Sequence, residues 1–174
     1  AQFIPRKGHR TLLAALPAVL AAQPRLRALL FGQGPELDAI RAQVAAAGWS
    51  ERVLLPGFRR DLARILPCVD VLAHPAEMEG LGVALLQAAA CGVPIVAGRA
   101  GGIPEIVRPG VNGELIEPGD AAALAEHLIR LLGDATLRRR YGAAGRQLVL
   151  DEFSVDAMVD GNRAVYAEVL AAAT

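Results

Sequence analysis

Lys7 is the one lysine among eighteen basic residues, all the others being Arg. It lies in a polar loop beside Gly8, directly after an apolar run that is typical of a β-strand. A compact ammonium binds a phosphate as a point charge, and a neighbouring glycine lets the ligand approach the backbone. Lys7 is therefore a candidate phosphate ligand. A solvated loop lysine is the alternative that this residue by itself leaves open.

A second candidate is the segment Glu79-Gly80-Leu81-Gly82, which separates a strand-like run from a helical one. Two glycines at a helix start leave backbone N–H groups free to point at an anion, and the helix dipole adds about half a positive charge there. A diphosphate fits such a site. Because Glu79 precedes these amides, its oxygens suit sugar hydroxyls better than the anion. The alternative is a carboxylate that only stabilises the helix N-terminus.

Gln87 follows Glu79 by eight residues, which is roughly 10 Å along a helix and close to the length of a diphosphate. A sugar and a ribose could therefore flank a diphosphate between these two side chains. A dinucleotide fingerprint is a weaker candidate, because Gly32-Gln33-Gly34 has Leu37 at the position of the third glycine. A tight turn with positive φ explains these glycines better.

Charge and composition exclude several classes of partner. Eighteen acidic residues balance the eighteen basic ones and aromatic residues make up 4%, whereas nucleic-acid binding favours a positive field and stacking surfaces. Cys68 and Cys91 lack companions at metal-ligand spacing, so we expect no metal site and interpret both as buried, reduced thiols of a cytoplasmic protein. The uncharged run 81–98 contains Gly92 and Pro94 and predicts a helix and a strand, not a membrane span.

Strand-like apolar runs alternate with helical runs along the chain. This pattern predicts an α/β fold, a doubly wound, Rossmann-like parallel sheet of about six strands with further helices at the C-terminus. Ligands bind at the carboxyl edge of such sheets, where the loops of Lys7, Phe58 and Glu79 would meet. We interpret 1–174 as a single domain whose apolar start is a cut through a longer protein. The expected strands are 1–4, 27–31, 53–55, 69–73, 94–97 and 111–116, and the main expected helices are 9–22, 36–47, 61–66, 82–90, 120–132, 135–150 and 154–172.

Short motifs follow one another along the chain: Pro5-Arg6-Lys7-Gly8-His9, Phe31-Gly32-Gln33-Gly34-Pro35, 53–58, 70–75, Glu79-Gly80-Leu81-Gly82 and Gly101-Gly102-Ile103-Pro104-Glu105. Their order and spacing resemble the group 1 (family four) retaining glycosyltransferases of GT-B architecture. The resemblance is to the C-terminal, donor-binding domain of that family and covers about residues 1–170. Because several linked motifs carry it, it is more specific than any one of them.

The resemblance implies a metal-independent enzyme without a cofactor that transfers a sugar from a nucleotide-sugar donor with retention of configuration. The acceptor, a sugar or a lipid-linked glycan, would be bound by an N-terminal domain absent from this sequence. The whole protein would be cytoplasmic and associate with the membrane surface. The roles implied here are diphosphate contact by Lys7, nucleobase contact by the backbone of Gly57, Phe58 and Arg59, sugar contact by Glu79, phosphate or sugar contact by the amides of Gly80, Leu81 and Gly82, and ribose contact by residue 87.

Two positions depart from the family pattern. Gln87 stands where the family usually has Glu, and Gln2 stands where it usually has Arg. Gln87 keeps an acceptor for a ribose hydroxyl and loses about 1 kcal/mol of charge-assisted strength. Gln2 removes a cation from the leaving diphosphate, a larger loss because the transition state must stabilise the departing charge. Arg6 is a candidate to compensate.

These departures keep a second hypothesis open, a non-catalytic nucleotide-binding or scaffold module whose donor site has decayed. A third reading, another GT-B enzyme such as a sugar epimerase or a phosphorylase, shares the architecture. A phosphorylase would need a lysine for pyridoxal phosphate, and Lys7 is the one lysine present. We therefore rank that reading lowest.

Overall fold

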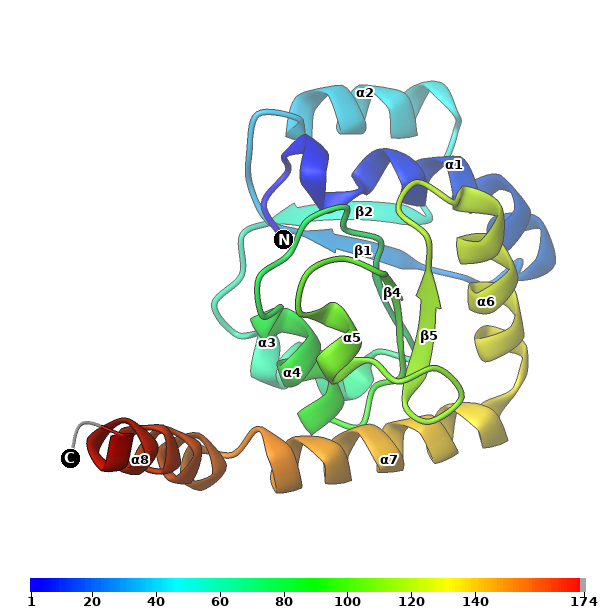
Figure 1. Cartoon of the computed structure of the whole chain (residues 1–174). Helices are drawn as coiled ribbons and strands as arrows, with labels where there is room; N and C mark the ends of the chain where they lie inside the picture. Colours follow the sequence, from blue (N-terminus) through cyan, green and yellow to red (C-terminus); the bar gives the residue numbers. More distant parts are fainter. Residues whose placement is uncertain (173–174) are drawn as a thin grey trace.

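The computed structural model describes residues 1–172 and confirms an α/β fold with parallel strands (Figure 1). One sheet pairs β1 (Ala28–Phe31) with β2 (Val53–Gly57). The other has the order β3 (Leu72–His74), β4 (Ile95–Gly98) and β5 (Gly113–Ile116). Since all strands of a parallel sheet end at the same edge, the loops after these strands gather on one side.

The N-terminal residues do not form the strand expected at 1–4. The Ala1 nitrogen donates a hydrogen bond to the oxygen of Phe31, the last residue of β1, at 2.8 Å. The Phe3 amide donates one to the Gln33 oxygen, just after β1, at 2.9 Å. A 3₁₀ turn, η1 (Pro5–Lys7), follows and ends the extended segment before a ladder can form. The described residues thus hold five strands in two sheets, whereas the sequence predicted about six in one.

Helices cover both faces of the larger sheet. Ile95 and Ala97 of β4 pack on the side of α4 (Val83–Ala90), while Val96 packs on the side of α1 (His9–Ala22) and α6 (Ala121–Gly133). All three side chains are fully buried, which explains why the strand is apolar at every position. The remaining helices are α2 (Leu37–Ala46), α3 (Leu62–Ile65), η2 (Leu66–Cys68), α5 (Ile103–Ile106), α7 (Ala135–Glu152) and α8 (Val155–Ala172).

The smaller sheet has its own apolar cluster. Leu13, Leu16 and Leu20 recur at helical spacing along α1 and pack with Leu30 of β1 and Val53 of β2. α1 also contacts α6. α1 therefore joins the two sheets, because one side of it packs on β1 and the other on the larger sheet.

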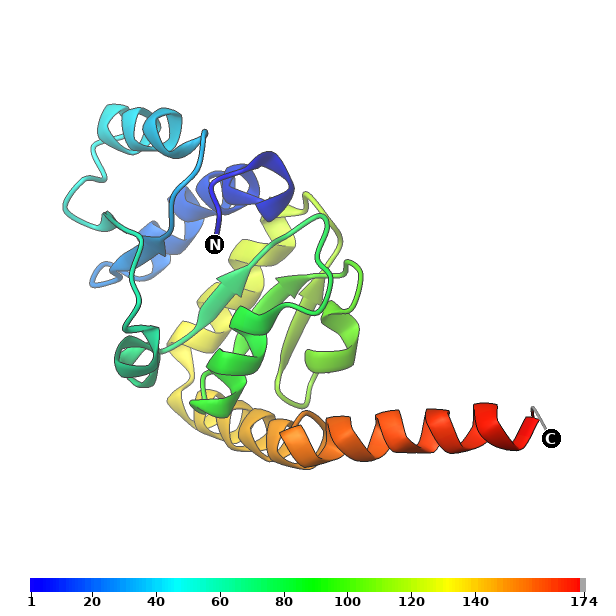
Figure 2. The same cartoon turned by 90° about the vertical axis from the view of Figure 1, so that its left-hand side faces the viewer.

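The C-terminal helices lie where the sequence predicted them, whereas Cys68 does not lie in the core. The three predicted C-terminal helices are present, but α8 has no buried residue and projects away from the sheets (Figure 2). Cys68 is exposed at the end of η2 rather than buried as expected, because this turn lies at the surface. Among residues 1–172, none of the helices combines the length and apolar character needed to span a bilayer.

Candidate functional site

Three loops meet at the carboxyl edge of the strands with almost no space between them. The Glu77 amide donates to the Arg6 oxygen and the Gly102 amide to the Gly80 oxygen, each at 2.9 Å. A Cβ atom on Gly8 would lie 1.8 Å from the Pro75 oxygen, and one on Gly101 would lie 1.8 Å from the Glu79 oxygen. Glycine is therefore required at both contacts, and this close packing fixes Lys7 relative to Glu79.

Glu79 is the centre of a charged group formed with Lys7 and His74. Its Oε2 atom accepts from Lys7 Nζ at 2.6 Å and lies 2.9 Å from His74 Nε2. The Lys7 and Glu79 side chains are 15% and 16% exposed, and that of His74 is 8% exposed. The fold thus brings together, at one point of the sheet edge, a cation and an anion that are 72 residues apart in the sequence.

Burial and charge act together on the titration of this group. Burial raises the pKa of Glu79, but the hydrogen bonds from Lys7 and His74 outweigh it and hold that pKa below its ordinary value. Burial lowers the pKa of His74, and the partnership with Glu79 opposes this only in part. At neutral pH Glu79 is therefore a carboxylate and His74 a neutral imidazole whose Nε2–H donates to it.

A cavity of about 140 Å³ lies beside these side chains, and Gln87 lines it together with Lys7, His9 and His74. Gln87 is exposed on α4. The fold therefore places Gln87 and Lys7 on the wall of the same cavity. Any small ligand bound there would meet an ammonium, an amide and an imidazole within one space.

The entrance of α4 contains a left-handed glycine and a carboxylate that accepts from one of the amides there. Gly82 takes a left-handed conformation with φ 74° immediately before the helix, and only glycine adopts this without strain. The Gly80 amide donates to Glu79 Oε1 at 3.2 Å. Glu79 is thus an anionic partner of one amide at this entrance, in addition to its contacts with Lys7 and His74. Leu81, which lies between the two glycines, is exposed.

Other predicted site residues lie outside this charged group. Gly57 is the last residue of β2, and Phe58 and Arg59 follow it. Phe58 is exposed, and Arg59 makes a two-point ion pair with Asp61 at 2.8 and 2.6 Å. Gln2 is exposed and is not among the residues that line the 140 Å³ cavity.

His74 is the residue of the charged group that the sequence argument did not single out. It is the last residue of β3 and the one polar residue in that strand. A histidine that ends an apolar strand at the carboxyl edge, five residues before a candidate carboxylate, is the signal that could have found it.

His9 stacks on Phe3 with ring centroids 4.4 Å apart, and its buried Nδ1 has no hydrogen-bond partner. Burial lowers the pKa of His9 from 6.5 to about 4. Protonation therefore favours the unfolded chain: the contribution of His9 to stability is complete above pH 6.5 and is lost as the pH falls through about 4.

We expect the unfolding free energy to fall more steeply over this pH range for the wild type than for His9→Phe, which keeps the stacked ring. Unfolding free energies are measured by urea denaturation at several pH values. An equal fall for the two proteins between pH 6.5 and about 4 would contradict this prediction.

Residues 1–148 match the sequence family described as glycosyl transferases group 1. The chain belongs to this family. Its group 1 relatives include a GDP-mannose-dependent monoacylated α-(1-6)-phosphatidylinositol monomannoside mannosyltransferase of Corynebacterium glutamicum, 37% identical over 164 residues. Another is the N-acetyl-α-D-glucosaminyl L-malate synthase of Bacillus anthracis, 35% identical over 153 residues. The chain matches through 90% and 88% of its own length and spans 43% and 40% of theirs.

Solved structures place this group 1 chain among the C-terminal domains of GT-B glycosyltransferases. HepE of Anabaena, solved in complex with UDP, superposes with a TM-score of 0.83 at 30% identity over 99% of this chain and 47% of that one. The C-terminal domain of the group 1 protein LpcC from Francisella tularensis superposes with a TM-score of 0.80 at 26% identity, over 88% of this chain and 83% of that one. The Rossmann-like fold expected from the sequence is thereby confirmed.

Proposed function

We propose that this chain binds the nucleotide-sugar donor of a retaining glycosyltransferase and that the whole protein transfers the sugar without a metal or a cofactor. The observation that carries the proposal is the pair of Lys7 and Glu79, 2.6 Å apart beside the cavity that Gln87 lines. HepE, at 30% identity, was solved with UDP and with UDP-glucose. A donor of the same class suits the ammonium and the amides of this edge.

Lys7 would act on the departing diphosphate. Before binding, its ammonium is neutralised by Glu79. A diphosphate carries more negative charge than one carboxylate, so it competes for Lys7 and leaves Glu79 to accept from sugar hydroxyls. As the bond to the sugar breaks, negative charge grows on the diphosphate, and a fixed ammonium stabilises that charge without reorganisation.

The remaining residues would bind the rest of the donor. The amides of Gly80, Leu81 and Gly82 at the start of α4 would contact phosphate or sugar, because the positive end of the helix dipole lies there. Gln87 would accept from a ribose hydroxyl, and the backbone around Gly57, Phe58 and Arg59 would contact the nucleobase.

The acceptor would be bound by a part of the whole protein outside this chain, since the chain spans 43% of the mannosyltransferase and 40% of the malate synthase relative. The Corynebacterium relative is named for a phosphatidylinositol mannoside acceptor. We propose a sugar or a lipid-linked glycan as acceptor and a cytoplasmic protein that reaches it at the membrane surface.

Calorimetric titration of the 174-residue chain with UDP, GDP and ADP tests the proposal. We expect at least one of the three to bind at millimolar concentration, because diphosphate contacts are made within this chain. If none of the three binds to a chain that circular dichroism shows to be folded, the proposal is ruled out.

A decayed donor site is the second candidate, favoured by the exposed position of Gln2 outside the cavity lining. In the whole protein, the double substitution Gln2→Arg and Gln87→Glu separates the two candidates. If the native protein transfers no sugar and the substituted protein does, the site has decayed. If the native protein is already active, the first proposal stands.

A further inference from the structure

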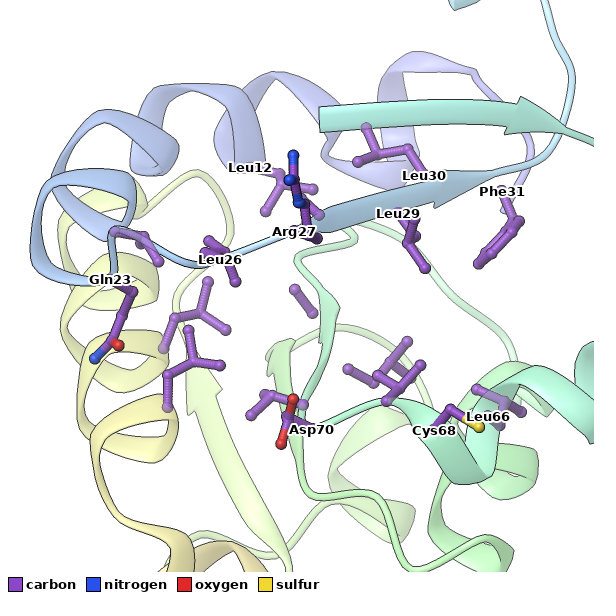
Figure 3. A pocket seen from close by; sticks show the side chains of 18 of the residues that line it. Leu12, Gln23, Leu26, Arg27, Leu29, Leu30, Phe31, Leu66, Cys68 and Asp70 are labelled. Carbon is purple, nitrogen blue, oxygen red and sulfur yellow. The ribbon is translucent and has the colours of Figure 1, made fainter. Parts of the chain in front are cut away.

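His74 is fixed by the strand that it ends. It is the last residue of β3 and pairs in register with Ala97 of β4, whose four residues are all buried. Leu72 and Ala73, the residues before it, line a mainly apolar groove of about 510 Å³ between β1 and β3 (Figure 3). The imidazole is itself buried. The backbone of His74 is therefore part of the sheet, and its side chain has little freedom to change partner.

Glu79 contacts two side chains that differ in mobility. Its Oε2 atom accepts from Lys7 Nζ at 2.6 Å and lies 2.9 Å from His74 Nε2. Lys7 reaches it from the η1 turn through a flexible four-carbon chain, whereas the imidazole ring is attached directly to the sheet. Oε1 accepts from the Gly80 amide at 3.2 Å, at the long end of the range for such bonds. Oε2 is thus the oxygen that is held, and Oε1 is the one that can accept from a further donor.

Binding of a nucleotide-sugar would remove only one of the two partners of Oε2. The diphosphate attracts the ammonium of Lys7 by charge. Burial lowers the pKa of His74, so the imidazole is neutral at neutral pH and the same anion attracts it far less. Without His74, Oε2 would then have no partner, and the carboxylate could rotate about its Cγ–Cδ bond, a torsion with a broad energy minimum. The contact with His74 is therefore the one that keeps the carboxylate in a single orientation.

We propose that His74 is the positioning residue for Glu79: its Nε2–H holds Oε2 while the diphosphate engages Lys7, so that Oε1 stays directed at a sugar hydroxyl. This inference rests on the proposed function and adds a residue to it. His74 acts through Glu79 and not on the reacting atoms. It should therefore determine how much the sugar adds to the affinity and have little effect on the binding of the nucleoside diphosphate alone.

Two substitutions of equal length separate hydrogen bonding from packing. His74→Gln keeps an N–H donor, and His74→Met replaces it by an apolar group. In the free 174-residue chain, carbon-13 NMR titration measures the pKa of the Glu79 carboxyl. We expect this pKa to be higher in His74→Met than in the wild type and to be lowered again in His74→Gln, because a hydrogen bond to the carboxylate favours the charged form. His127→Met is the matched control, since His127 lies on α6 and lines neither cavity, and it should leave the pKa of Glu79 unchanged.

A second measurement compares each nucleotide-sugar with its nucleoside diphosphate by calorimetric titration. The probe pairs are UDP and UDP-glucose, GDP and GDP-mannose, and ADP and ADP-glucose, and the pair that binds is used. For His74→Met we expect the affinity for the nucleoside diphosphate to stay within about twofold of wild type and the affinity for the nucleotide-sugar to fall by about three- to tenfold, the equivalent of one hydrogen bond. His74→Gln should recover most of this loss.

Equal pKa values of Glu79 in the two His74 variants would overturn the proposal, because the N–H donor would then make no difference. An equal loss of affinity for both members of the probe pair in His74→Met would also overturn it, since His74 would then support the whole site. If His74→Met does not fold, nitrogen-15 NMR of the wild-type imidazole decides: a proton on Nδ1 alone excludes donation from Nε2 to Glu79. If none of the pairs binds, the proposed function fails, and the titration of Glu79 still shows whether His74 holds the carboxylate.

Discussion

Replacing Lys7 by Met is expected to weaken nucleoside-diphosphate binding by about 10- to 150-fold, the equivalent of a charged hydrogen bond of about 1.5–3 kcal/mol. The reason is that Lys7 is the one lysine of the chain and its ammonium lies beside the cavity at the strand edge. If the whole protein transfers a sugar, the same substitution should lower kcat by about 10²- to 10³-fold, because the developing charge loses its fixed partner. Isothermal titration and steady-state kinetics measure the two effects.

Arg41→Met is the matched control for Lys7→Met. Arg41 is an exposed cation that pairs with Asp38 at 2.6 Å on α2, so its removal changes the net charge equally at a surface position. We expect its nucleotide affinity to stay within about twofold of wild type. Equal affinities for the Lys7 and Arg41 variants would show that Lys7 does not contact the diphosphate.

Substituting Gly8 by Ala is expected to lower the free energy of unfolding by about 2–5 kcal/mol, the sum of left-handed strain and steric overlap. Gly8 has φ 70°, and a Cβ atom there would lie 1.8 Å from the Pro75 oxygen. The two loops must separate to accommodate it, which moves Lys7 away from Glu79. Urea denaturation measures the loss of stability, and nucleotide titration measures the loss of the site.

Gly110→Ala separates the two causes of this destabilisation. Gly110 has φ +76°, yet nothing lies within 4 Å of a Cβ atom built there. Its substitution therefore includes the backbone strain without the overlap, and we expect a loss of about 1 kcal/mol with nucleotide affinity unchanged. If Gly8→Ala and Gly110→Ala were equally destabilising, the close packing of the η1 loop on Pro75 would contribute nothing.

Local pattern was sufficient to predict most elements. The helix predicted at 9–22 matches α1, and the three C-terminal helices agree to within two residues at each end. Apolar periodicity and capping residues such as Asp120, which accepts from the Ala123 amide at 2.9 Å, are local signals. The sequence also predicted that Lys7 and Glu79 would share one sheet edge, because parallel strands end together.

The contacts between loops could not be predicted in this way. The Lys7, His74 and Glu79 group depends on distances between loops up to 72 residues apart, which periodicity does not contain. The reason the Gly8 position excludes a side chain is likewise a tertiary contact, with Pro75.

The amino-acid sequence by itself determined the class of fold, the order of the elements and the sheet edge that Lys7 and Glu79 share, because these follow from apolar periodicity and the direction of parallel strands. Only the tertiary structure decided that Glu79 already neutralises Lys7 and that β1 and β3 stand apart across an apolar groove. Side-chain pairing and strand pairing join residues distant along the chain, so their outcome depends on packing that no local pattern specifies.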